Sequence, residues 1–199
     1  MKILKIVAIS ASTVLAAALL TACTVNVGTS DMKSDSGMMM DHGMMGDSSS
    51  EFSGEDIMFA QMMIPHHQQA VDLSKFALKN SSNKAIRSIA TGIASGQGKE
   101  IAQMKFWLRA TKSSATMGHH MDMNGMISDK QMKALGGLKG AKFDKAFITA
   151  MIEHHQGALE MVVMLETSKN SEAKKLAKDI LHVQKAEIAT MKKLLATFA

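Results

Sequence analysis

Apolar positions recur at steps of three and four residues along four long stretches of the chain. This spacing predicts four amphipathic helices, which lie near 54–80, 83–110, 141–168 and 171–198. Polar residues at 80–83 and 169–171 mark turns inside each pair of helices, and Ser171 is expected to cap the last helix. A short helix near 129–136, capped by Ser128, is expected between the pairs.

The two pairs of helices are copies of one sequence. The run from Phe59 to Ala70 reappears as Phe147 to Ala158 at an offset of 88 residues, and the helices that follow match at an offset of 87. Two helical hairpins, each with one apolar face, bury those faces on each other as an all-α four-helix bundle. We therefore expect a domain over 52–199, made of repeat one (55–110), a link (111–140) and repeat two (141–198).

Helix-breaking residues interrupt the first copy. Gly92, Gly96 and Gly98 lie within the second predicted helix, where each costs about 1 kcal/mol relative to alanine. They either let a neighbouring element approach closely or make this helix the least stable one. Pro65 lies about ten residues into the first helix and is expected to kink it beside two histidines.

The composition is unusual in its sulfur. The chain has 20 methionines, one cysteine, seven phenylalanines, one tryptophan and no tyrosine. A single cysteine excludes an internal disulfide framework and any cysteine-clustered zinc or iron–sulfur site. The net charge of +5 falls to +3 once Lys2 and Lys5 are removed with a signal peptide, which does not indicate nucleic-acid binding.

The N-terminus has the features of an export signal. Lys2 and Lys5 precede an apolar run that ends in Leu20-Thr21-Ala22-Cys23 and is too short for a membrane span. This order resembles the bacterial lipoprotein signal, which implies that residues 1–22 are a signal peptide and that Cys23 carries lipid. The alternative is an ordinary secretory signal.

We expect a lipoprotein anchored to a membrane and facing the periplasm or the cell exterior. Thr24 favours the outer membrane in a cell that has one. Residues 23–51 are rich in Ser, Gly, Asp and Met without a helical period, and are expected to form a disordered tether.

The candidate chemistry lies in a Met-x-x-His-His sequence in the first helix of each copy. Its three side chains stand at i, i+3 and i+4 and project from one helical turn. Two-fold packing of the copies would bring both sets together. Thioether and imidazole suit Cu(I), and by the same softness Ag(I), better than Mg, Ca or Mn. The candidate ligands are Met63, His66, His67, Met151, His154 and His155, and the candidate hydrogen-bond partners behind them are Gln97, Glu100, Gln184 and Glu187.

Packing is the alternative explanation for these side chains. Met104, Met161, Met164 and Met191 are expected to be core residues. The histidines could form a structural network with a glutamine or a carboxylate. Four histidines in two matched pairs, each with a methionine one turn earlier, favour metal binding over that network.

Two further Met/His clusters lie outside the predicted helices, where packing is not expected to explain them. Flexible capture of Cu(I) is the favoured interpretation, with affinity that falls as pH drops because histidine must be neutral to bind. The alternatives are low-complexity drift and a sink for oxidants. The residues are Met38, Met39, Met40, His42, Met44 and Met45 in the tether, and Met117, His119, His120, Met121, Met123 and Met126 in the link.

The doubled motif resembles a known family. Each Met-x-x-His-His run is followed by a Gln-x-x-Glu-Ile-x-x-Met helix, and over about residues 55–197 this is similar to the bacterial family of domain of unknown function 305. The family's fold is described as ferritin-like, a four-helix bundle, and some members are exported copper-binding proteins of copper resistance. The resemblance implies that His66, His67, His154 and His155, with Met63 and Met151, bind copper.

Three functions follow from these patterns. The favoured one is a lipid-anchored protein that sequesters or delivers Cu(I) or Ag(I) without catalysis, with the ion, the membrane and a copper-transfer protein as partners. A ferritin-like metalloenzyme is disfavoured because such sites need a Glu-x-x-His on each of two helices, and the sequence has none. A structural or interaction lipoprotein with a histidine network is the third. The sequence does not indicate an oligomeric state.

Overall fold

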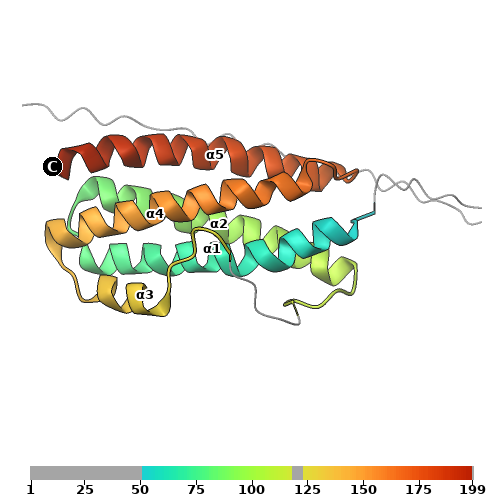
Figure 1. The fold of residues 1–199 in the computed structure, drawn as a ribbon, viewed down its shortest axis with the longest axis horizontal. Coiled ribbons are helices and arrows are strands. Elements are labelled where there is room, and N and C mark those ends of the chain that lie inside the picture. Colours follow the sequence, from blue (N-terminus) through green and yellow to red (C-terminus); the bar gives the residue numbers. More distant parts are fainter. Residues whose placement is uncertain (1–50, 118–122, 199) are drawn as a thin grey trace, which may run out of the picture. The chain divides into compact units, whose positions relative to one another are not determined.

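The structure is a computed structural model that describes residues 51–117 and 123–198, and these residues form an all-α fold without strands (Figure 1). The elements are α1 (Gly54–Asn80), α2 (Lys84–Ala110), α3 (Asp129–Gly136), α4 (Gly140–Val162), the 3-10 turn η1 (Val163–Leu165), α5 (Ser171–Leu195) and the 3-10 turn η2 (Ala196–Phe198). The predicted four-helix bundle is confirmed. The predictions for the signal peptide, for Cys23 and for the tether up to residue 50 lie outside the described residues.

Side-chain caps explain where α1, α2, α3 and α5 begin, whereas α4 begins after Lys139 without a side-chain cap. Ser53 and Asp56 form a reciprocal capping box at the start of α1, and Ser128 and Gln131 form another at α3. Asn83 caps α2 through its side-chain oxygen. At α5 the cap is Asn170, whose side chain accepts from two backbone N–H groups, so the expected cap at Ser171 is wrong by one residue.

Helix–helix packing sets the order of the bundle. α1 packs along both α2 and α4, and α4 packs along α5, whereas α2 and α5 do not pack closely. Phe59 and Met63 of α1 share an apolar cluster with Ala158 and Met161 of α4. A second cluster joins later residues of α1 to earlier residues of α4, so the two helices run antiparallel.

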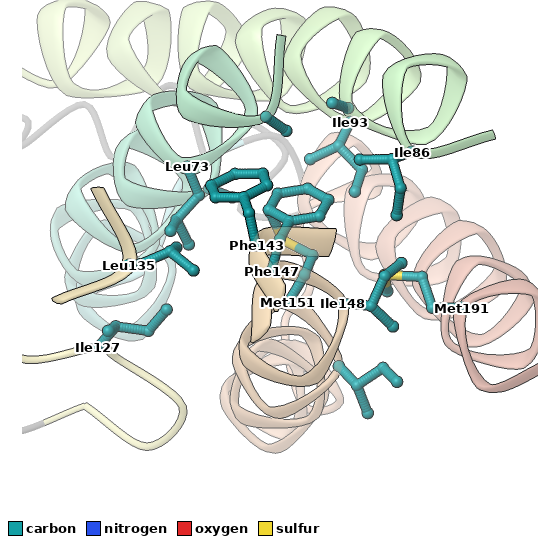
Figure 2. Packing of buried hydrophobic residues seen from close by; sticks show 14 of the residues in the cluster. Leu73, Ile86, Ile93, Ile127, Leu135, Phe143, Phe147, Ile148, Met151 and Met191 are labelled. Carbon is teal, nitrogen blue, oxygen red and sulfur yellow. The ribbon is translucent and has the colours of Figure 1, made fainter. Parts of the chain in front are cut away.

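The second cluster contains two stacked aromatic rings of α4. Phe143 and Phe147 of α4 stack with ring centroids 6.0 Å apart, and Leu73 of α1 and Met191 of α5 pack around them (Figure 2). Leu135 of the short helix α3 closes this side. The methionines expected in the core are there: Met104, Met161 and Met191 are buried, and Met164 is partly buried against the core.

The end of α4, Pro65 in α1 and the glycines of α2 each bear on a prediction from the sequence. α4 ends as an α-helix at Val162 and tightens into η1, instead of continuing to residue 168. α1 runs on through Pro65 as one helix. A side chain built at Gly92, Gly96 or Gly98 meets nothing within 4 Å, so these glycines do not admit a close neighbour.

Among the described residues, no helix combines the length and the apolar character that crossing a membrane requires.

Candidate metal centre

The four paired histidines lie in one layer across the middle of the bundle. His66 and His67 come from α1 and His154 and His155 from α4, and all four are fully buried. The rings of His66 and His154 are in contact, with centroids 3.8 Å apart and planes tilted by 40°. The duplication therefore places one histidine of each copy in direct contact with the other. We call these four residues the histidine layer.

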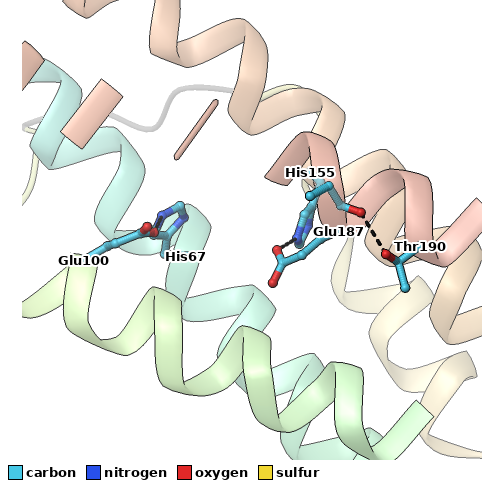
Figure 3. A network of polar contacts seen from close by, with 6 residues as sticks. His67, Glu100, His155, Glu187 and Thr190 are labelled. Atoms are coloured by element: carbon cyan, nitrogen blue, oxygen red, sulfur yellow. Dashed lines mark hydrogen bonds and ion pairs between the residues drawn. The ribbon is translucent and has the colours of Figure 1, made fainter. Parts of the chain in front are cut away.

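The outer histidine of each pair bonds a carboxylate on the next helix. His67 Nε2 lies 2.7 Å from Glu100 Oε2 of α2, and His155 Nε2 lies 2.8 Å from Glu187 Oε2 of α5 (Figure 3). Both glutamates were candidate partners from the sequence, and both are partly exposed. Each copy thus repeats a carboxylate–imidazole pair that connects the buried layer to the surface.

These contacts define the tautomers. A carboxylate and a backbone carbonyl only accept hydrogen bonds, so the ring nitrogen that faces one must donate. His66 Nε2 faces the backbone oxygen of Asn124 at 3.2 Å, in the same way that His67 and His155 face glutamates. The neutral form of each of these rings carries its lone pair on Nδ1. All three Nδ1 atoms are buried without a hydrogen-bond partner.

Other polar atoms in the same region are also unpaired. Neither ring nitrogen of His154 has a hydrogen-bond partner, and the same holds for both amide atoms of the buried Gln97 and Gln184. Such a group costs about 1–3 kcal/mol when buried unpaired. Most buried side-chain atoms of this kind in the described residues belong to these histidines and glutamines. The donor set therefore fits a bound ion better than it fits a purely apolar core.

Burial keeps the inner histidines neutral. Desolvation, followed by the neighbouring charge of His67, lowers the pKa of His66 to about 3, with the Asn124 carbonyl opposing the shift. Desolvation, followed by the charge of His66, lowers the pKa of His154 well below its ordinary value. The backbone of His66 opposes that second shift, although the contact falls short of hydrogen-bond geometry. Both rings are therefore uncharged at neutral pH, with one ring nitrogen left unprotonated, which is the form that binds metal.

The two thioethers are separated from each other. Met63 is buried among Phe59, Met104 and Trp107, whereas Met151 is buried in the cluster of Phe147. Because α1 and α4 are antiparallel, the turn before each histidine pair extends toward opposite ends of the bundle. Within 51–117 and 123–198, no three His, Cys, Asp or Glu side chains form a group that could hold a metal. The structure therefore joins His66 to His154 and does not gather all six candidate ligands.

The end of the link contributes to the histidine layer, which sequence reasoning missed. The Asn124 carbonyl accepts from His66, and the side-chain amide of Asn124 donates to Glu160 at 2.5 Å. A Cβ built on Gly157 would lie 1.9 Å from the Asn124 oxygen, so only glycine allows this contact. Gly125 beside it has a φ of +79°.

Comparing the two sequence copies could have pointed to this contact. Gly157 occupies the position of Gln69 in the first copy, the one change inside the His-His-Gln run. Gln69 in turn holds the link by two hydrogen bonds to the backbone of Ile127, at 2.7 and 2.8 Å. Both differing positions therefore serve the same purpose, which is to seat the link against α1 and α4.

The methionines of the link differ in how they are packed. Met123 is partly buried and packs against the cluster that contains Met63, so the expectation that packing explains none of them is wrong there. Met117 and Met126 are half-buried, whereas His119, His120 and Met121 lie outside the described residues.

Comparisons with known proteins agree with the fold. The family model described as Domain of unknown function (DUF305) matches residues 56–195. A DUF305 protein of Streptomyces coelicolor, proposed to be secreted, is 31% identical, with a TM-score of 0.69 over 72% of this chain and 92% of its own. A DUF305 fragment from Deinococcus radiodurans is 30% identical, with a TM-score of 0.68 over 74% of this chain and 99% of its own.

A further similar structure carries a metal. CopM in its Cu(I)-bound form is 33% identical, with a TM-score of 0.61 over 72% of this chain and 96% of its own. CopM has also been solved with Cu(II), with silver and in the apo form. A comparison with curated proteins found no match.

Proposed function

Since this chain belongs to the DUF305 family, we propose that it binds Cu(I) or Ag(I) and sequesters or delivers the ion without catalysis. CopM, a relative of similar fold, is known in copper-bound and silver-bound forms. The observation that carries the proposal is the set of buried, unpaired imidazole nitrogens in the histidine layer. Soft monovalent ions bind such nitrogens well and accept few ligands.

The glutamate partners support the same proposal. In metal sites, a ligating histidine commonly donates its other ring N–H to a carboxylate or a backbone carbonyl. His67, His155 and His66 have such partners in Glu100, Glu187 and the Asn124 carbonyl. Each partner leaves the Nδ1 lone pair available to an ion.

We further propose that the protein is exported and lipid-anchored through Cys23, on the sequence of its first 23 residues. The Streptomyces relative, itself proposed to be secreted, supports export. In an oxidising compartment methionine persists where paired thiols would oxidise. The Met/His runs of the tether and link would capture the ion there, and the bundle would hold it.

The test is a Cu(I) titration of the mature protein against a competing chelator. We expect more than one bound ion. A variant with His66, His67, His154 and His155 all changed to Ala should lose at least one of them while keeping its helical circular dichroism. If the wild-type protein competes no better than buffer, the copper proposal is wrong.

A second function has its own observation. The bonds from His66, His67 and His155 to fixed acceptors would equally suit a structural network that orients the helices. In that case the four-alanine variant would bind as many ions as the wild type but would unfold at a lower temperature. The same titration therefore separates the two functions.

A further inference from the structure

The histidine layer is closed to bulk solvent. All four imidazoles have an exposed fraction of 0%. An ion that binds them must pass between two helices. α1 packs closely on α2 and on α4, and α4 on α5, so among the described helices the α2–α5 side is the least closely packed one.

A groove of about 310 Å³ lies on that side. Its walls include Ile89 and Gly92 of α2 and His182, Ala186 and Glu187 of α5. Glu187 is the group that joins this groove to the interior, because it lines the groove and also bonds the buried His155 at 2.8 Å (Figure 3). His182 is exposed and provides an imidazole to the same groove.

The first copy does not repeat these features around Glu100. At the offset of 87 residues, Ser95 stands in place of His182, and Lys99 stands in place of Ala186. A lysine next to the carboxylate repels an approaching cation, and a serine offers no soft ligand. The two sides of the duplicated bundle therefore differ where an ion would arrive.

The position of Gly92 at this groove offers a reason for a glycine there. A Cβ built there meets nothing within 4 Å, so a side chain would extend into open space beside the groove, which Gly92 lines. A glycine inside an exposed helix costs about 1 kcal/mol relative to alanine, a cost that nothing in the helix packing offsets. An open groove mouth is a functional reason for it.

We propose that soft monovalent ions reach the histidine layer through the α2–α5 groove, with His182 and Glu187 as the first ligands they meet and Gly92 keeping the mouth wide. This inference rests on the proposed function, since it requires that the layer binds an ion. The groove is then the path by which the ion enters and leaves, and the residues that line it govern the rates of both steps.

The test compares two leucine variants of α2 in the mature full-length protein. Ag(I), which does not change oxidation state under these conditions, is loaded and then released to excess chelator in a stopped-flow experiment. The phase that disappears when all four layer histidines are changed to Ala reports the layer. Gly92→Leu should slow both uptake and release in this phase about tenfold, a barrier higher by about 1.4 kcal/mol, with equilibrium affinity unchanged.

Gly98→Leu is the matched control, because Gly98 is also exposed on α2, meets nothing within 4 Å and does not line the groove. It should leave both rates unchanged. His182→Ala, an exposed position that the fold does not need, should slow uptake independently. If the layer phase exists but neither Gly92→Leu nor His182→Ala changes it, or Gly98→Leu slows it equally, the access path is wrong. If wild type has no such phase, the histidine layer does not hold the ion, and that part of the proposed function fails together with this inference.

Discussion

Histidine protonation is the residue-scale property that distinguishes this bundle from an ordinary apolar one. His66 and His154 are fully buried in the core, and burial lowers the pKa of both. An unfolded histidine titrates near pH 6.5. The unfolded chain therefore binds protons on these histidines at a higher pH than the folded chain does, and acid favours unfolding.

The pH dependence of stability follows from the lowered pKa of His66. Between about pH 6.5 and the folded pKa of about 3, the unfolded state binds a proton that folded His66 does not. The free energy of unfolding should fall with decreasing pH, by about 1.4 kcal/mol per unit for such a histidine. Urea denaturation at pH 7 and pH 5 should show a smaller loss in His66→Gln than in wild type. Equal losses would mean that His66 is protonated in the fold.

Docking of the link is the element-scale feature that completes the histidine layer. The backbone of residues 124–127 lies against α1 and α4, held by Gln69 and made possible by the bare backbone of Gly157. Helical periodicity describes one element at a time, so this contact between a loop and two helices has no periodic signature. It connects the loop that carries the second Met/His run to the buried imidazoles.

Gly157→Ala should displace the link. Its methyl group would overlap the Asn124 carbonyl, a backbone atom that cannot rotate away, and overpacking of this kind costs about 1–3 kcal/mol. Thermal denaturation should show the loss, and hydrogen exchange should speed up over 123–127. Gly96→Ala is the control, because Gly96 is exposed with open space around it and should gain up to about 1 kcal/mol. A neutral Gly157→Ala would contradict the docked arrangement.

Two kinds of candidate site coexist at the scale of the whole molecule. The bundle contains imidazoles whose pKa is lowered by burial. The Met/His runs of the tether and link, in contrast, were predicted as flexible metal-binding segments outside the helices. A metal site in the bundle and a metal site in a Met/His run should lose their ions at different pH values, since protons compete with the metal for the same lone pair.

Deleting residues 24–51 should lower the number of bound Cu(I) ions without changing the helical circular dichroism. At pH 5, ions held by imidazoles with an ordinary pKa near 6.5 should be released first. The ion of the histidine layer should remain, because the pKa of His66 is about 3. Titrations of both forms at pH 7 and pH 5 would check this. Loss of every bound ion from both forms at pH 5 would contradict a separate buried site.

Local sequence determined the helices to within a few residues at their ends, because periodicity, capping side chains and turn residues act within a few residues of one another. The internal duplication likewise identified the histidines and the glutamates that bond them. Tertiary structure decided what those side chains meet. The antiparallel register of α1 and α4 joined His66 to His154 and sent Met63 and Met151 into separate clusters. It also placed Asn124 and the α2–α5 groove, since contacts between distant segments depend on packing that no single helix encodes.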